Sequence, residues 1–189
     1  MGAMPDSFLG DGLIFEELLP LAFSPGPLIE GLALARMNAD NHQLLSAEAS
    51  LDDVRVHEAL KDESPALVHE LQRLEFKLNI LLRLTAELAV RNSALPPPQR
   101  CRLSARGLEW FAEQAPASGG TGVMSAYINP ALPQPFKAPC TVVGERTVDG
   151  QRVAQLRFSG LSDTVVDLLE KLIFRHHRRL VAVSRLASN

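Results

Sequence analysis

The stretch SPALVHELQRLEFKLNILLRLTAELAVRN, residues 64–92, carries the strongest periodic pattern in the sequence. Its seam residues recur at alternating steps of four and three, which is the heptad spacing of a coiled coil. They are Leu67, Leu71, Leu74, Leu78, Leu81, Thr85 and Leu88. Ser64 can cap a helix and Pro65 suits its first position, while the proline run at 96–98 has to end it. The pattern therefore predicts one long, coiled-coil-like helix.

The predicted helix is apolar beyond this single seam. Phe76 and Ile80 lie off the seam line, and Leu82 and Leu84 flank it. A two-stranded coiled coil would leave these side chains in water, whereas a helical bundle or a second docked face would cover them. We predict a homo-oligomer held by this helix, with a tetramer favoured over a dimer. The alternative is a core helix of a larger domain.

Length and composition favour a small protein with a real core. The chain has 189 residues, 46% of them hydrophobic, which suits one domain with an insertion or two small domains. It contains no apolar run of about 18 residues, which a membrane span needs, and no signal-peptide pattern at its start. Cys101 and Cys140 lack metal-ligand spacing. We expect them to be buried, reduced thiols of a cytoplasmic protein rather than a disulfide or a catalytic thiol.

The net charge of −3 hides an asymmetry along the chain. Residues 1–92 hold 7 basic and 15 acidic residues, a balance of −8, and residues 93–189 hold 12 and 7, a balance of +5. An anionic ligand would therefore bind more easily to the second part of the chain.

The chain before the long helix predicts a strand and then a first helical region. Apolar residues alternate over residues 13–23, and Pro20 argues against a helix there. Further along, apolar residues return to the heptad-like spacing, with the polar Asn41 inside the stripe. Asn41 could fix the register of an oligomer, or it could simply face solvent. Ser50 with Asp53 resembles a capping pair, and it predicts a further short helix.

The chain after the prolines predicts short strands and a last helix. The strand-like segments are residues 99–103, 107–112, 122–128, 136–148 and 151–159. Asp149 and Gly150 form a hairpin signal between the last two, and Ser162 can cap a final amphipathic helix. Together with residues 13–23, these segments predict an α+β fold, in which a small antiparallel barrel is closed by a C-terminal helix.

Two segments of this region match the motifs of a known family. Residues 103–108, LSARGL, look like the family's Asp-x-Ser-x-x-Gly turn followed by a strand. Residues 156–180, LRFSGLSDTVVDLLEKLIFRHHRRL, are similar to its last strand and closing helix. On these motifs, residues 100–181 resemble the PilZ domain, the small β-barrel that receives cyclic di-guanylate (cyclic di-GMP) in bacteria.

The resemblance implies a division of the chain. The family places a strand ahead of its serine–glycine turn, and residues 13–23 would supply it. The PilZ-like barrel would then comprise residues 8–24 and 93–189. Residues 25–92 would be a helical oligomerisation insertion between its first two strands.

The departures from the family motif bear on ligand binding. In the family, an Arg-x-x-x-Arg segment before the first strand stacks on guanine and contacts phosphate, but residues 5–12 contain no arginine. Arg102 stands where the family has aspartate, which inverts the charge. The candidate ligand-binding residues that remain are Arg100, Arg102, Ser104, Arg106 and Gly107. We expect cyclic di-GMP binding to be lost, and we predict no cofactor.

Other chemistries find little support in the sequence. His176 and His177 are adjacent, so a helix points them in different directions, and no carboxylate completes a metal site with both. The arginines at 175–179 fit a solvated helix face better than a nucleic-acid patch. We found no glycine-rich phosphate loop, catalytic triad or paired carboxylates on one face. We therefore predict neither an enzyme nor a metal site.

Taken together, these patterns favour a non-catalytic bacterial signalling or adaptor module of PilZ type. It would self-associate through the heptad helix and contact a protein partner that the sequence does not identify. The alternative is a cyclic di-GMP receptor that uses non-standard residues. A third reading, a helical scaffold with an unrelated β appendage, requires that the last 90 residues form no barrel.

Overall fold

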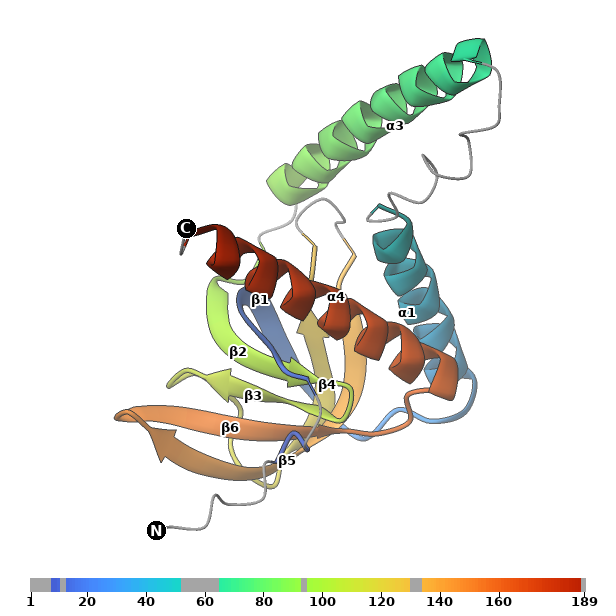
Figure 1. The fold of residues 1–189 in the computed structure, drawn as a ribbon. Coiled ribbons are helices and arrows are strands. Elements are labelled where there is room, and N and C mark those ends of the chain that lie inside the picture. The colour runs from blue at the N-terminus through green and yellow to red at the C-terminus, as the bar shows by residue number, and fades with distance from the viewer. Residues whose placement is uncertain (1–7, 11–12, 52–64, 93–94, 130–133, 188–189) are drawn as a thin grey trace.

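The computed structural model describes residues 8–10, 13–51, 65–92, 95–129 and 134–187. Six antiparallel strands form a closed barrel in the order β1-β2-β3-β6-β5-β4 (Figure 1). The strands are β1 (Phe15–Pro25), β2 (Pro98–Ser104), β3 (Gly107–Phe111), β4 (Thr121–Ala126), β5 (Phe136–Val148) and β6 (Gln151–Phe158). The helices of the described residues are α1 (Gly31–Leu51), α3 (Pro65–Asn92) and α4 (Asp163–Ala187). The predicted α+β fold, an antiparallel barrel with a C-terminal helix, is confirmed.

Strand β1 closes the barrel by pairing with two strands. Its first part is antiparallel to β2, with Phe15 opposite Leu103, and its second part is antiparallel to β4, with Leu21 opposite Ala126. The observed strand lies two residues later at each end than the predicted segment 13–23. Helices α1 and α3 both lie between β1 and β2 in the sequence.

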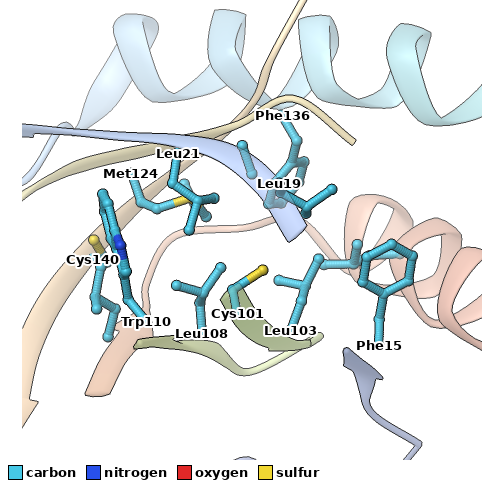
Figure 2. Close-up of a cluster of buried hydrophobic side chains, with 14 of the residues drawn as sticks. Phe15, Leu19, Leu21, Cys101, Leu103, Leu108, Trp110, Met124, Phe136 and Cys140 are labelled. Carbon is cyan, nitrogen blue, oxygen red and sulfur yellow. The ribbon is translucent and has the colours of Figure 1, made fainter. Parts of the chain in front are cut away.

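Alternate side chains of the strands fill the barrel interior (Figure 2). The buried cluster includes Leu19, Leu21, Leu103, Leu108, Trp110, Met124 and Phe136. Cys101 and Cys140 belong to it as free thiols. Burial raises the pKa of the Cys101 thiol to about 12 and that of Cys140 to about 11. Because the thiolate is the reactive form, both cysteines are packing residues at neutral pH.

Helix α4 lies across the barrel and buries its apolar face against it (Figure 1). Val165, Leu169 and Ile173 belong to the same core as the strands. The backbone N–H of Val165 donates to the Ser162 hydroxyl at 3.4 Å, so Ser162 caps the helix as predicted. The amphipathic pattern of this segment is therefore the pattern of a closing helix.

Helix α1 packs along α4 and against β5, and Asn41 makes the most specific contact of this packing. Asn41 is only 2% exposed. Its side-chain N–H donates to the Lys137 carbonyl at 2.7 Å, and its Oδ1 accepts from the Lys137 N–H at 3.0 Å. Both predicted roles of Asn41, in an oligomer seam or facing solvent, are therefore wrong. The amide instead satisfies the backbone of a strand in its own chain.

The observed limits of α3 agree with the local signals of the sequence. Pro65 is its first residue, and the helix ends at Asn92, ahead of the proline run. The short helix predicted from Ser50 and Asp53 falls on residues 52–64, outside the described residues. Among the helices of the described residues, none combines the length and apolarity needed to cross a membrane.

We expect Asn41→Ala to lower the free energy of unfolding by about 1–3 kcal/mol, because a backbone N–H and a C=O of β5 would lose their partner in a buried place. Urea unfolding followed by circular dichroism measures the change. Asn38→Ala is the matched control, since Asn38 on the same helix makes a similar pair of bonds to Gly160 and Ser162 near the surface. Equal losses for the two variants would contradict the importance of burial.

Candidate functional site

The turn between β2 and β3 holds the residues that match the family motif. The Ser104 hydroxyl accepts from the Arg106 N–H at 3.2 Å and lies 3.4 Å from the Gly107 carbonyl, to which it can donate. A β-carbon at Gly107 would lie 2.4 Å from the carbonyl oxygen of Leu156 and 3.2 Å from the ring of Phe8. Glycine is therefore required here by close packing, and the serine holds the turn in shape.

Residues 8–10, which precede β1 in the chain, lie against this turn. The Phe8 ring occupies the space where a β-carbon on Gly107 would point, and the guanidinium of Arg157 lies 5.7 Å from the centroid of that ring. The guanidinium of Arg106 would be 3.6 Å from a β-carbon placed on Gly10. The structure thus joins residues 8–10, which we call the pre-strand segment, to the serine–glycine turn. The segment brings an aromatic ring to the turn, and residues 5–12 contribute no arginine.

Arg100 and Arg102 lie on the outer face of β2 and share one carboxylate, Glu16 of β1. Arg100 donates to Oε1 through Nε at 3.0 Å and Nη2 at 2.6 Å, and Arg102 donates to Oε2 through Nε at 2.9 Å. Both guanidinium groups also lie over the ring of Phe111, at 4.7 and 5.5 Å from its centroid. Burial raises the pKa of Glu16, but the hydrogen bonds and charges of the two arginines outweigh it and bring the pKa below its usual value.

A second carboxylate, Glu109, continues this contact on β3. Glu109 is 3% exposed, and it accepts from Arg146 at 2.8 Å and from Gln155 at 3.1 Å. Arg102 lies 4.0 Å from it. The outer face of the barrel therefore carries one connected row of charged side chains from β1, β2, β3 and β5, which we call the charged row: Glu16, Arg100, Arg102, Glu109 and Arg146. The neutral Gln155 of β6 adds a hydrogen bond to Glu109.

The predicted ligand residues therefore separate into two places. Ser104, Arg106 and Gly107 form one turn, whereas Arg100 and Arg102 belong to the charged row. Sequence reasoning missed Glu16, although it predicted that its strand joins the barrel. Opposite charges at paired strand positions were the available signal, but only the observed register puts Glu16 opposite Arg102.

A cavity of about 260 Å³ lies beside α4, between β1 and the last turns of α1. Its apolar lining is Phe15, Leu18, Leu19, Ile128 and Leu172, and its polar lining is Glu17, Glu48, Arg175, His176 and Arg179. No sequence pattern marks this cavity, because its lining residues come from separate elements. Within the described residues, no group of three or more His, Cys, Asp or Glu is arranged to hold a metal ion.

His176 and His177 differ sharply in environment. The His176 ring packs on Phe15 with centroids 4.0 Å apart, and its Nε2 lies 3.6 Å from Glu17. His177 is exposed. Burial lowers the pKa of His176, with Arg179 and His177 acting in the same direction and Glu17 opposing. His176 is therefore a packing residue that resists protonation.

We expect the stability of the protein to fall as the pH drops below about 6.5, because the unfolded chain then protonates His176 more readily than the folded chain does. The contribution of neutral His176 to the free energy of unfolding is fully present above the usual histidine pKa. It is lost as the pH falls through the lowered pKa of His176 in the folded chain. His176→Gln should flatten this part of the curve of unfolding free energy against pH. His177→Gln is the control and should change the curve less, because it removes only one of the smaller causes of the lowered His176 pKa and leaves the burial of that ring in place. Equal effects of the two substitutions would contradict the assignment.

Helix α3 presents its seam leucines to solvent and extends away from the barrel (Figure 1). The exposed fractions of Leu67, Leu71, Leu74, Leu78 and Leu81 range from 37% to 59%. Thr85, Phe76 and Leu84 are exposed as well, while the side chain of Leu88 lies outside the described part. Among the described residues, α3 forms no substantial packing with another helix or strand.

The fold and the turn define the class of this protein: a six-stranded antiparallel barrel of PilZ type with a closing helix. The family model of the atypical PilZ domain, described as a cyclic di-GMP receptor, matches residues 45–186. This match covers more than half of the chain, and the chain belongs to the atypical PilZ family. The match begins inside α1 and omits β1, whose place in the barrel comes from the structure.

One solved structure is similar to nearly the whole chain. It is a pathogenic protein from Xanthomonas campestris, with a TM-score of 0.70, 29% sequence identity and 91% of each chain covered. That protein is described as a new tetrameric PilZ domain that self-assembles through an unusual helical bundle. No curated protein matches this chain.

Proposed function

We propose that this protein is a non-catalytic PilZ-type adaptor that self-associates through α3 and has lost cyclic di-GMP binding. In this proposal residues 8–24 and 93–189 form the barrel unit, and residues 25–92 are the oligomerisation insertion. The observation that carries the self-association is the row of exposed leucines on α3. Cys101 and Cys140 are buried free thiols, which suit the reducing cytoplasm, and we place the adaptor there. We also propose that it contacts a protein partner whose identity is unknown.

The exposed surface of α3 is too apolar for a helix that stays in water. A contiguous apolar patch on a monomer usually marks an interaction site. Leu74, Leu78 and Leu81 are each more than half exposed, and Phe76, off the seam, is 66% exposed. The heptad spacing makes a second copy of α3 a complementary partner, because its leucines repeat at the same interval.

The distribution of apolar residues around α3 favours a tetramer over a dimer. In a two-stranded coil Phe76 and Leu84 would remain in water, whereas a four-helix bundle can cover a wider stripe. The similar Xanthomonas campestris protein is described as tetrameric through a helical bundle, which supports the same arrangement here.

We expect the double variant Leu74→Glu with Leu81→Glu to be monomeric, because each charge would be buried against the seam of a neighbouring helix. Sedimentation velocity at tens of micromolar, roughly the range of ordinary association constants, measures the mass of the native chain and of the variant. The barrel should remain folded by circular dichroism, since neither side chain belongs to its core.

The matched control is Ala66→Glu with His69→Glu, which adds the same two charges to exposed positions of α3 outside the seam. This control should keep the mass of the native oligomer. A native chain that sediments as a monomer under these conditions would contradict self-association.

Two departures from the family motif and one ion-pair arrangement support the loss of cyclic di-GMP binding. No arginine precedes β1, and Arg102 replaces the family's aspartate. Arginine has no hydrogen-bond acceptor, so Arg102 cannot take the guanine donors that an aspartate accepts. The charges of Arg100 and Arg102 are also already paired with Glu16.

We expect calorimetric titration with cyclic di-GMP to show no saturable heat in the low micromolar range. Losing two arginine contacts, at roughly 1–3 kcal/mol each, weakens binding by about one to four powers of ten. A dissociation constant below about 1 µM would contradict the loss of binding.

The alternative function, a receptor with non-standard residues, is favoured by one arrangement at the turn. Phe8, Arg106 and Arg157 gather around Gly107, and an aromatic ring with two guanidinium groups could stack on and pair with a guanine base. The family description as a cyclic di-GMP receptor supports the same alternative. If the titration gives a sub-micromolar constant, Arg106→Ala and Arg157→Ala should weaken it, whereas an unchanged constant would exclude this arrangement.

A further inference from the structure

Arg100 and Arg102 together hold one carboxylate between their guanidinium groups, and we call this pair the fork. The fork has the geometry of an anion site. Two guanidinium groups from one strand each take one oxygen of a single carboxylate, with three N–H···O contacts between 2.6 and 3.0 Å. Fork-shaped guanidinium groups bind the two free oxygens of a phosphate diester in the same manner. The fork therefore suits a phosphate group as well as it suits Glu16.

The neighbouring groups keep both arginines in place for such a ligand. Phe111 lies beneath the two guanidinium groups, which are within cation–π distance of its ring. Glu109 is a weaker partner for Arg102 than Glu16 is, because it lies 4.0 Å from Arg102 and already accepts from Arg146 and Gln155 at 2.8 and 3.1 Å. The two arginines would therefore keep their positions if Glu16 left the fork.

The fork is also accessible to dissolved anions that could replace the Glu16 carboxylate. The side chains of Glu16, Arg100 and Arg102 are 41%, 43% and 31% exposed, so solvent and solutes reach them. Surface ion pairs of this kind are weak, since water and salt compete with them. A dissolved phosphate can therefore compete with Glu16, although the nearby negative charge opposes it.

We propose that the Arg100–Arg102 fork is a phosphate-diester site that the chain occupies with its own Glu16 carboxylate. Glu16 acts as an internal anion, and the ligand class of the site is a nucleotide phosphate whose base can stack on a guanidinium plane above Phe111. The inference rests on the proposed loss of cyclic di-GMP binding in the native chain and gives it a physical cause. It also predicts that a change at this one residue regains part of the binding, although the missing pre-strand arginines and the lost aspartate are not restored.

The test is a titration of Glu16→Gln with cyclic di-GMP, and separately with inorganic phosphate, followed by calorimetry and by NMR of the arginine Nε–H groups. We expect about ten- to a hundredfold tighter binding than in the native chain, because the freed charge-assisted hydrogen bonds become available to the ligand. Shifts of the Arg100 and Arg102 signals with both probes assign the site to the phosphate group. Shifts with the dinucleotide alone assign it to phosphate and base together.

Glu17→Gln is the matched control, because Glu17 is the next residue on β1, carries the same charge and lines the cavity beside His176 instead of the fork. It should not gain binding. Adding Arg100→Gln and Arg102→Gln to the Glu16→Gln chain should abolish the gain. Glu16→Thr, which retains a good strand residue, repeats the test if the first variant folds poorly.

The outcomes separate this inference from the proposed function. If Glu16→Gln gains nothing, if Glu17→Gln gains equally, or if the gain survives loss of both arginines, the internal-anion site is wrong while the proposed function stands. If the native chain binds cyclic di-GMP tightly, the proposed function is wrong. In that case an unchanged constant in Glu16→Gln also overturns the internal-anion site, and a tighter one supports it.

Discussion

Strand β1 is the element on which the rest of the structure depends, because the barrel closes only when it pairs with β2 and β4 together. Its position brings Glu16 to the arginines of β2, Phe15 to His176 of α4, and the pre-strand segment to the serine–glycine turn. Each of these contacts joins residues far apart in the sequence. A barrel without β1 would have two open edges and none of these sites.

The chain leaves the barrel after β1 and returns at β2, and the two helices that the structure describes between them, α1 and α3, behave differently. Helix α1 folds back on β5 and α4, where Asn41 satisfies the Lys137 backbone. Helix α3 stays apart and exposes its leucines. The entropic cost of a connection grows slowly with its length, so a long insertion between β1 and β2 adds little to the free-energy cost of closing the barrel. The barrel and the exposed helix can therefore serve separate purposes.

The outer face of the barrel pairs its charges within the chain. Glu16 and Glu109 lie among Arg100, Arg102 and Arg146, so most of the charge that could attract a phosphate is already balanced. The turn keeps its serine and glycine because they satisfy packing and hydrogen bonding there. Membership of the atypical PilZ family is shown by the match over residues 45–186, and the barrel with its closing helix agrees with it.

The sequence by itself determined the elements whose signals are local: alternation in the strands, the limits of α3, the Ser162 cap and the hairpin at Asp149 and Gly150, both of which have positive φ. The tertiary structure alone decided which distant side chains meet. Arg102 binds Glu16 across 86 positions and Asn41 binds Lys137 across 96. Such pairs depend on strand register, where a shift of one residue turns every side chain to the opposite face, and no local pattern encodes that register.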